Sequence, residues 1–245
     1  MKAIILAAGR GSRLGKLTDL KPKGMTEIFG IPLLDWQHST LKLAGIKDIF
    51  VVTGYLSEVF EKKGYQTLYN PNWHRSNMVA SLMLALENCE PPLIVSYSDI
   101  IFSKKIINDL IKSKADLSVA YDKNWLKLWQ MRFEDPLIDA ESFALNSNKN
   151  IIEIGNKVKD LSKIQGQFMG LLKINLKGKN FIKEIINQDK SNLFKLDTTT
   201  LLNKIIKSGK TVHAIANEEG WCEVDSPNDI NVAAKLIKDG IIKLP

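Results

Sequence analysis

A glycine-rich loop flanked by basic residues lies close to the start of the chain. The almost wholly apolar segment Lys2–Ala7 predicts a buried strand, and it leads directly into a loop that contains Gly9, Gly11 and Arg13. Because glycine has no side chain, the backbone amides of such a loop can lie against phosphate oxygens. Arg13 and, further on, Lys23 would supply positive charge. The pattern therefore favours a nucleotide bound through its phosphates.

The loop matches neither of two familiar phosphate-binding patterns. The Walker pattern has four residues between its glycines and then Gly-Lys-Ser or Gly-Lys-Thr, which this loop lacks. The dinucleotide fingerprint Gly-x-Gly-x-x-Gly needs a third glycine where Leu14 stands, and Gly15 comes one residue too late. A Gly-x-Gly by itself is explained by a tight turn about as often as by a ligand.

The longer string is more specific than its glycines, and it resembles a known family. Leu6-Ala7-Ala8-Gly9-x-Gly11-Ser12-Arg13, followed by Lys21-Pro22-Lys23, resembles the nucleotidyltransferases that include the sugar-1-phosphate and phosphocholine enzymes. The resemblance implies that Arg13 and Lys23 bind the triphosphate as catalytic groups. It also implies that the loop wraps the nucleotide with Leu6, Ala7, Ala8, Gly9, Gly11 and Ser12.

Two aspartates are candidates for binding a divalent cation. Phosphoryl and nucleotidyl transfer concentrate negative charge, so the proteins that perform them usually recruit Mg²⁺ through one or two carboxylates. Asp99 follows the apolar segment Leu93–Tyr97, at the end of a predicted strand where open α/β sheets place ligands. Asp225 precedes the last predicted helix, and either it or Ser226 could instead cap that helix.

The family resemblance favours the metal-binding role for both aspartates. It implies that Mg²⁺ is held by one aspartate after a central strand and by a second near the C-terminus, which match Asp99 and Asp225. Glu223 and Asp229 flank the second site, and we expect them to be surface or capping groups.

The segment at the start of the helix predicted over Asn77–Asn88 indicates which base is bound. Asn77 and Ser81 are four residues apart, hence on one face at the start of a helix, and Ser76 could cap it. The pattern Asn77-x-x-x-Ser81-Leu82 resembles cytidylyltransferases that act on small phosphorylated alcohols or phosphonates, which implies contacts with cytosine and ribose. The Gln/Gly-rich segment typical of sugar-specific relatives is missing from the sequence here. CTP is therefore the expected nucleotide.

The middle of the chain contains candidate acceptor-binding residues. Arg132 could bind an acceptor carboxylate or phosphate with two hydrogen bonds, and Lys157 could act as a catalytic group at the α-phosphate. For each, a solvated surface charge is an equally open interpretation. Three strings resemble cytidylyltransferases of phosphonate and phosphoramidate-type capsule precursors, and phosphoglutamine is one such acceptor. The strings are Trp129–Glu141, Ile154–Lys157 and Gly166–Gly170. The acceptor-binding residues expected are Arg132, Glu134, Gln167 and Trp221.

Phosphocholine is a less favoured acceptor. A quaternary ammonium would need an aromatic cage, and Trp125, Trp129 and Trp221 could build one. Core packing is the commoner fate of tryptophan, so an amino-acid-like or phosphonate acceptor ranks higher.

Composition excludes several other classes of protein. The 245 residues carry a net charge of +7, but the basic residues are mostly scattered lysines and only four are arginines, which does not indicate nucleic-acid binding. No apolar run approaches the roughly 20 residues that cross a bilayer, so we expect no membrane partner and a cytoplasmic location. Cys89 and Cys222 match no metal-ligand spacing and suit a reducing compartment.

Strand-like and helical segments alternate through the first half of the chain, which predicts parallel β-α units. The expected strands are Lys2–Ala7, Asp48–Gly54, Gln66–Tyr69, Leu93–Tyr97 and Asp116–Tyr121. The expected helices are Pro32–Ala44, Leu56–Lys63, Asn77–Asn88 and Lys104–Lys112. We therefore expect an α/β fold with a doubly wound, mostly parallel, Rossmann-like sheet of the nucleotidyltransferase type, with ligand groups at the carboxyl ends of its strands.

Shorter strands around polar turns characterise the second half and predict a small mixed β lobe that binds the acceptor. These strands are Phe143–Leu145, Ile151–Ile154 and Phe168–Ile174, followed by a further strand at Val212–Ile215. Helices are expected at Asn180–Asn187, Thr198–Ser208 and Pro227–Lys238. Because no repeat or linker divides the sequence, we expect a single domain over 1–245, with a nucleotide-binding half (1–122) and a region (123–245) that holds the acceptor and the C-terminal metal aspartate.

The sequence thus favours a Mg²⁺-dependent cytidylyltransferase that transfers CMP from CTP to a small phosphate or phosphonate and releases pyrophosphate. The expected role is the modification of a surface polysaccharide or capsule. We expect the protein to be a monomer or a homodimer. The open alternatives are a phosphocholine cytidylyltransferase, a sugar-1-phosphate nucleotidyltransferase that uses UTP or dTTP, and a noncatalytic nucleotide-sensing subunit.

Overall fold

Apolar strands form the centre of the fold. The computed structural model of the chain describes residues 1–243. Strand β1 (Lys2–Ala7) is buried along almost its whole length, as is its neighbour β6 (Leu93–Tyr97). Strands that are apolar on both faces need cover on both faces, which in parallel sheets is supplied by helices.

Seven strands make one sheet, in the order β12, β8, β11, β6, β1, β4, β5. In that order they span His213–Asn217, Leu117–Asp122, Gln167–Ile174, Leu93–Tyr97, Lys2–Ala7, Asp48–Thr53 and Gln66–Tyr69. Strand β1 pairs in parallel with β4 and β6, β4 pairs in parallel with β5, and so does β8 with β12. Among the seven strands described for residues 1–243, only β11 runs antiparallel to both of its neighbours, β6 and β8. The predicted α/β class with a mostly parallel sheet is confirmed.

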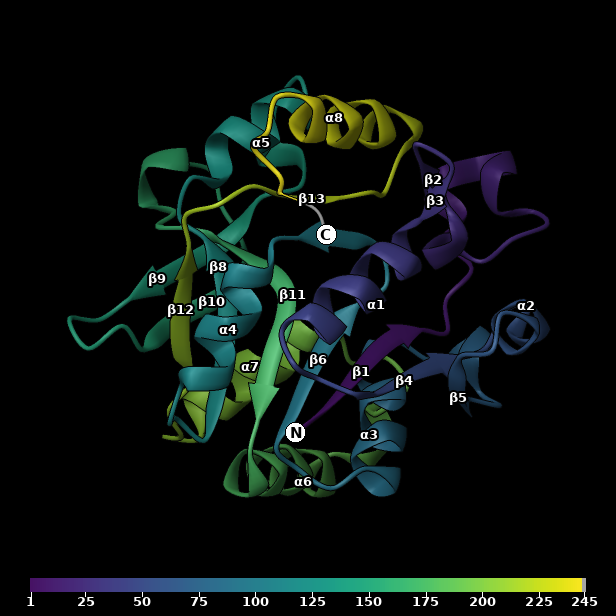
Figure 1. Cartoon of the computed structure of the whole chain (residues 1–245). Coiled ribbons are helices and arrows are strands. Elements are labelled where there is room, and N and C mark those ends of the chain that lie inside the picture. The colour runs from purple at the N-terminus through teal and green to yellow at the C-terminus, as the bar shows by residue number, and fades with distance from the viewer. Residues whose placement is uncertain (244–245) are drawn as a thin grey trace.

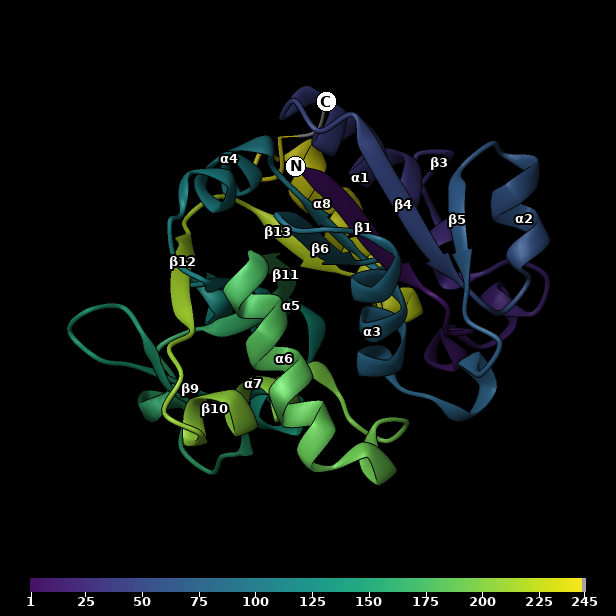
Figure 2. The ribbon, with the colours of Figure 1, turned by 90° about the horizontal axis from the view of Figure 1, so that it is seen from below.

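Helices cover both faces of this sheet, as Figures 1 and 2 show. One face is covered by α1 (Leu33–Leu43) and α4 (Lys104–Lys112), and the other by α3 (Met78–Asn88), α6 (Leu176–Gln188) and α7 (Thr198–Lys207). Helix α2 (Ser57–Lys62) lies beside the edge strand β5. Helices α5 (Trp125–Arg132) and α8 (Pro227–Lys238) pack on each other above the sheet in Figure 1.

Short elements complete the architecture. Three two-stranded antiparallel sheets pair β9 (Glu141–Leu145) with β10 (Ile151–Lys157), β7 (Ile100–Phe102) with β13 (Trp221–Glu223), and β2 (Glu27–Ile28) with β3 (Ile31–Pro32). The 3₁₀ helices are η1 to η6, at Ser12–Thr18, Lys23–Met25, Trp73–Arg75, Pro136–Ile138, Leu161–Lys163 and Lys190–Asn192.

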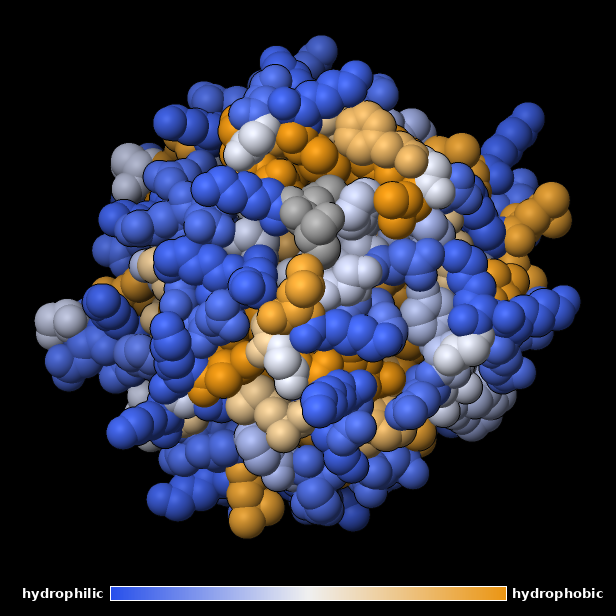
Figure 3. Space-filling view, in the orientation of Figure 1, coloured by the Kyte–Doolittle hydropathy of each residue, from blue (hydrophilic) through white to orange (hydrophobic). Residues whose placement is uncertain are grey.

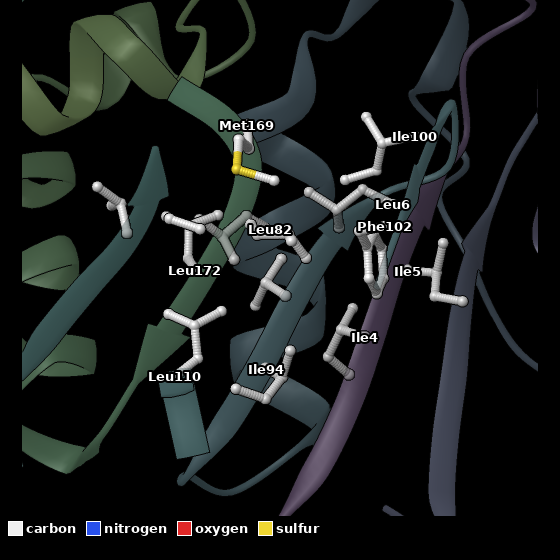
Figure 4. Packing of buried hydrophobic residues seen from close by; sticks show 14 of the residues in the cluster. Ile4, Ile5, Leu6, Leu82, Ile94, Ile100, Phe102, Leu110, Met169 and Leu172 are labelled. Carbon is white, nitrogen blue, oxygen red and sulfur yellow. The ribbon is translucent and has the colours of Figure 1, made fainter. Parts of the chain in front are cut away.

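The buried side chains form one apolar cluster that draws on both halves of the chain. Figure 4 shows Ile4 of β1, Ile94 of β6 and Leu172 of β11 on neighbouring strands, with Leu82 and Leu110 from helices close by. Such packing fixes the strands relative to one another, and with them the loops at their carboxyl ends.

One predicted strand lies in a different place from that expected. The segment Phe168–Ile174 was expected in the small lobe, but β11, which contains it, crosses the central sheet between β6 and β8. Leu171, Leu172 and Ile174 are all buried, and a strand that is apolar on both faces needs the cover that helices give to both faces of the central sheet. The two-stranded sheet of β9 and β10 is what remains of the predicted lobe.

Polar and charged side chains cover most of the face shown in Figure 3, in keeping with the many lysines of the sequence. Within residues 1–243, no helix combines the length and the hydropathy that crossing a bilayer requires.

Candidate active site

The glycine-rich loop follows β1 and folds over Lys23. Gly11 lies in the left-handed region, at φ 76° and ψ 48°, and a Cβ on it would stand 2.6 Å from Cβ of Lys23. Both facts require glycine at this position. The Thr18 hydroxyl donates to the carbonyl of Gly11 at 3.2 Å and braces the turn. A Cβ on Gly9 would meet nothing within 4 Å in the described structure, so the backbone there is open to a ligand.

Three carboxylates meet where the first half of the chain contacts its last strand. Asp99 follows β6, whereas Glu223 ends β13 and Asp225 follows it. The pairing of β13 with β7 sets Glu223 opposite Ile100, and the amide of Val224 donates to the carbonyl of Asp99 at 2.8 Å. One carboxylate oxygen from each of the three acidic residues lies within 4.8 Å of the others.

Two basic side chains contact this cluster. Lys23 Nζ lies 2.6 Å from Asp99 Oδ2 and also donates to Asp225 Oδ1, while Arg13 Nη1 lies 2.9 Å from Asp225 Oδ2. Burial by itself would lower the pKa of Lys23, but the carboxylates of Asp99, Asp225 and Glu223 outweigh it and raise the pKa well above its usual range. The Arg13 side chain is 66% exposed, so it can turn toward a ligand.

The cluster fits a divalent cation. Asp99 Oδ1 is buried and accepts no hydrogen bond from residues 1–243, although a buried polar atom normally has a partner. Burial, followed by repulsion from Asp225 and Asp99, raises the pKa of Glu223. The unpaired oxygen of Asp99 and the repulsion between the carboxylates would both be relieved by a cation, and carboxylate oxygens are the ligands that Mg²⁺ prefers.

Arg132 lies behind the carboxylates. Its side chain is 0% exposed, with Nε 2.9 Å from Asp229 Oδ1, Nη1 3.2 Å from Glu223 Oε2, and Nη2 3.8 Å from Asp225 Oδ2. The sequence suggested a role in binding the acceptor. That role stays a prediction, because the guanidinium is buried beside three carboxylates of its own chain, although Nη2 has no hydrogen-bond partner among residues 1–243. From the interior of the protein, Arg132 contacts two carboxylates of the acidic cluster, those of Glu223 and Asp225.

Asp229 connects Arg132 to the loop that carries Asp225. Its Oδ2 accepts hydrogen bonds from the amides of Asp225 at 2.9 Å and Ser226 at 2.8 Å, and Ser226 in turn caps α8 in a capping box. Asp229 is thus a capping group, as expected, but a buried one. Glu223, expected to be a surface or capping group, faces the two aspartates. The alternation of acids in Glu223-x-Asp225 was the available sequence signal for it.

A first cavity of about 220 Å³ adjoins the loop and Asp99. It brings together many of the residues that the sequence assigned to the nucleotide, along with the metal-binding candidate Asp99: Leu6, Ala8, Gly9, Gly11, Arg13, Lys23, Asn77, Ser81 and Asp99. Ala7 is instead buried within β1, and Ser12 is exposed at the start of η1. Trp73, Met78, Tyr97 and Ser98 also line this cavity and were not predicted.

Asn70 is a residue of this site that the sequence did not indicate. Its side-chain amide donates to the hydroxyls of Ser76 and Ser81, each at 3.1 Å, and so ties the segment before α3 to the cavity wall. The N-cap of α3 is Asn77, whose Oδ1 accepts from the amide of Met78 at 2.7 Å. Ser76, the capping residue considered from sequence, belongs to the Asn70 network instead.

A second cavity of about 250 Å³ lies beside the first and shares Arg13, Met78 and Tyr97 with it. Its other lining residues include acidic, aromatic and hydroxyl side chains: Trp129, Asp139, Glu141, Ser142, Phe143, Ile154, Gln167, Phe168, Asp197, Thr198, Thr199, Glu223 and Asp225. Gln167 is the acceptor-binding candidate that the structure brings to this cavity.

The remaining acceptor and catalytic candidates line neither cavity in the described part of the chain. Glu134 is exposed beyond the end of α5, and Lys157 is exposed at the end of β10. Trp221 is buried and donates from Nε1 to Asp122 Oδ2 at 2.8 Å, so its ring packs in the interior. Sequence patterns do not show which way a side chain points from its strand or helix, so they assigned these residues to the acceptor site.

The sheet, the glycine loop over a lysine, and the acidic cluster beside two adjoining cavities define the nucleotidyltransferase class of α/β enzymes. The chain belongs to the family of MobA-like NTP transferase domains, whose pattern matches residues 3–137. The predicted resemblance to nucleotidyltransferases is therefore confirmed.

Two relatives illustrate the similarity within this family. The CTP:phosphoglutamine cytidylyltransferase of Campylobacter jejuni subsp. jejuni serotype O:2 is 35% identical over 255 residues, which cover 95% of this chain and 98% of the relative. The choline-phosphate cytidylyltransferase of Streptococcus pneumoniae R6 is 28% identical over 196 residues, which cover 77% of this chain and 86% of the relative.

Solved structures have the same fold. The CTP:phosphocholine cytidylyltransferase from Streptococcus pneumoniae aligns with a TM-score of 0.73 at 22% identity, over 96% of this chain and 98% of that one. A putative glucose-1-phosphate thymidylyltransferase from Bacillus anthracis aligns with a TM-score of 0.77 at 23% identity, over 98% and 96%. The fold is thus shared by enzymes that differ in nucleotide and acceptor. The substrates of this chain therefore have to be inferred from the residues of its site.

Proposed function

We propose that this protein is a Mg²⁺-dependent cytidylyltransferase that transfers CMP from CTP to a small phosphate or phosphonate and releases pyrophosphate. The observation that carries the proposal is the contact between the two cavities. They share Arg13, and the acidic cluster lies along both, with Asp99 on the first cavity and Asp225 on the second. A triphosphate in the first cavity and an acceptor in the second would therefore meet beside the cluster.

The residues of the chain suggest how the reaction would proceed. An acceptor phosphate is already ionised, so it needs no general base to attack the α-phosphorus in line, and no covalent enzyme intermediate is expected. Lys23 and Arg13 would bind the charge of the departing pyrophosphate. In the described structure Lys23 pairs with both aspartates, so binding of the nucleotide requires its ammonium to turn toward the phosphates.

The same cluster supplies the metal site of the proposal. Asp99 and Asp225, with Glu223 beside them, would hold Mg²⁺, which would neutralise phosphate charge as it develops in the transition state. The likeness to two cytidylyltransferases supports CTP as the nucleotide. The geometry assigns no part in the reaction to Lys157, which is exposed and outside both cavities.

The acceptor and the physiological role are parts of the same proposal. The relative that acts on phosphoglutamine aligns over nearly the whole of both chains, which supports a small amino-acid-like or phosphonate acceptor ahead of phosphocholine. The activated product would then serve to modify a surface polysaccharide or capsule. We place this activity in the cytoplasm, where CTP is available.

A panel of substrates tests the proposal. Pyrophosphate release is measured with CTP, UTP, dTTP, ATP and GTP, each against phosphoglutamine, 2-aminoethylphosphonate, phosphocholine and glucose 1-phosphate. We expect turnover with CTP and one of the first two acceptors. Preferred use of UTP or dTTP with glucose 1-phosphate would establish a sugar-phosphate enzyme instead, and tight binding of CTP without turnover on any acceptor would indicate a nucleotide sensor.

A further inference from the structure

The second cavity has an excess of negative charge that the chain does not neutralise. Its lining includes five carboxylates and one cationic side chain, Arg13. Two of the carboxylates, Glu223 and Asp225, already form ion pairs with basic residues. The other three form no ion pair within 4.0 Å among residues 1–243: Asp139, Glu141 and Asp197.

The fold holds these three residues in place. The side chain of Gln167 clamps the backbone of Glu141, since its Oε1 accepts from the Glu141 amide at 3.2 Å and its Nε2 donates to the Glu141 carbonyl at 2.6 Å. Asp197 is the N-cap of α7, where its Oδ1 accepts from the amide of Thr200 at 2.7 Å. Asp139 directly follows η4. Gln167 thus acts by positioning an acidic group.

A buried polar atom without a partner belongs to the same cavity. Thr198 Oγ1 has no hydrogen-bond partner in the described chain, and Thr198 is 1% exposed and lines the second cavity. An unpaired buried polar group is costly, and a hydroxyl oxygen can accept a hydrogen bond, so this atom indicates a ligand that carries donors.

The charge of the cavity indicates the kind of ligand. Burial, then repulsion from Asp197 and Asp139, raises the pKa of Glu141, so a cation placed among the three carboxylates would relieve an unfavourable interaction. The carboxylate oxygens not used in capping can each accept a hydrogen bond.

The aromatic rings of the cavity favour a hydrogen-bonding cation over a quaternary one. Four rings line the cavity, and each packs against another group of the chain. The guanidinium of Arg132 lies 5.1 Å from the centre of the Trp129 ring, the ring of Phe143 stacks on Tyr121 at 4.9 Å, and Tyr97 and Phe168 pack edge to face at 5.9 Å. The rings are therefore partly covered by one another and by Arg132, which leaves a poor aromatic cage. A primary ammonium has three N–H donors, and carboxylates are the partners that it requires.

We propose that the second cavity selects an acceptor that carries a primary ammonium group, held by Asp139, Glu141 and Asp197, while its phosphate or phosphonate faces Arg13. This inference rests on the proposed cytidylyltransferase function and specifies the chemical class of its acceptor. It predicts that acceptors without an amine are poor substrates whatever the size of their carbon chain.

Acceptor selectivity tests this inference. The kcat/KM values of the wild-type protein with CTP are measured for 2-aminoethylphosphonate, for propylphosphonate as its uncharged analogue, and for phosphocholine. We expect a preference of about tenfold or more for the amine over both others, the effect of one charge-assisted hydrogen bond. Equal turnover of amine and uncharged analogue would overturn the inference and leave the cytidylyltransferase function standing.

Matched variants show whether the carboxylates cause the preference. Glu141→Gln and Asp197→Asn remove charge but keep shape, and asparagine still caps a helix. Each should reduce the ratio of kcat/KM for the amine over the uncharged analogue by about tenfold. Asp160→Asn, an exposed residue outside both cavities, is the control and should leave the ratio unchanged.

Three outcomes remain distinguishable. An equal fall in kcat/KM for both acceptors in Glu141→Gln would show a structural role and contradict the inference. Loss of the preference alone, with the KM for CTP and the melting temperature retained, would support it. Turnover restricted to UTP or dTTP and glucose 1-phosphate would overturn the proposed function, and this inference with it.

Discussion

The amide of Val224 donates a hydrogen bond to the carbonyl of Asp99 at 2.8 Å, and this bond joins the two halves of the acidic cluster. Asp225 follows Val224 directly, so the bond fixes the separation of the two aspartates. It continues the pairing of β13 with β7, in which Glu223 lies opposite Ile100. The candidate metal site is therefore built on backbone pairing, which holds its geometry more firmly than a mobile loop would.

Asp99→Asn should nearly abolish activity without unfolding the protein. Asparagine keeps the shape but removes the charge beside Lys23, which still pairs with Asp225. We expect kcat to fall on the order of 10³-fold, as measured by pyrophosphate release. Circular dichroism should show an unchanged fold, and Asp160→Asn serves as the control. Near-normal turnover of Asp99→Asn would rule out its assignment to the metal.

Chelation should stop the reaction reversibly. We expect no pyrophosphate release in excess EDTA and full recovery when Mg²⁺ is added. Mg²⁺ should also stabilise the wild-type fold by about 2.7 kcal/mol at a concentration of 100 Kd, because it binds only the folded cluster. Thermal unfolding measures this effect. A similar stabilisation of Asp99→Asn by Mg²⁺ would place the metal elsewhere.

Gly11→Ala should weaken both the fold and nucleotide binding. The new Cβ would meet Lys23 at 2.6 Å and would need a left-handed backbone, so we expect a loss of about 2–5 kcal/mol in unfolding free energy and a raised KM for CTP.

Gly64→Ala is the matched control for this prediction. Gly64 has a similar φ of 79°, but a Cβ there would meet nothing within 4 Å among the described residues. Its cost should stay near 1–2 kcal/mol, about that of the backbone alone, with the KM for CTP unchanged. Equal losses in the two variants, measured by urea unfolding, would refute the claim that Lys23 packs under the loop.

Asp229→Asn should weaken Mg²⁺ binding although Asp229 is not itself one of the cluster carboxylates. It removes a partner of the buried Arg132 and alters the acceptor of the Asp225 amide, so about 3–5 kcal/mol of stability should be lost. The concentration of Mg²⁺ that gives half-maximal activity should rise.

Ser226→Ala separates this positioning effect from helix capping. It removes the capping hydroxyl of α8 but leaves Arg132 and Asp229 paired, so it should cost about 0.5–2 kcal/mol without changing the Mg²⁺ requirement. If both variants changed the Mg²⁺ requirement equally, Asp229 would act through the helix alone.

Much of the nucleotide side of the site could be predicted from local sequence. The segment Lys2–Ala7 is apolar enough to be a central strand, and the loop after it carries its glycines and Arg13 at fixed short distances along the chain. Asp99 was predictable for the same reason, because the carboxyl ends of parallel strands lie at one edge of the sheet. These residues are close in space mainly because neighbouring parallel strands end together.

The acceptor side could not be predicted in this way. Arg132 and Trp221 carry groups that suit a ligand, yet both are turned inward, one to Asp229 and the other to Asp122. Glu141, which lines the second cavity, ends the string of residues around Arg132, but the string does not show which of its side chains reach a ligand. Local patterns reveal strands and turns, but the direction of a side chain there depends on contacts between distant segments.

The sequence by itself determined the family, the mostly parallel sheet and the phosphate loop, because these depend on short-range patterns of apolar, glycine and basic residues. Only the tertiary structure decided that β11 enters the central sheet, that Glu223 joins Asp99 and Asp225, and that an acidic cavity adjoins the nucleotide site. The physical reason is that burial and pairing are properties of the whole chain. Whether a carboxylate binds a metal ion or caps a helix depends on which segments of the chain pack against it.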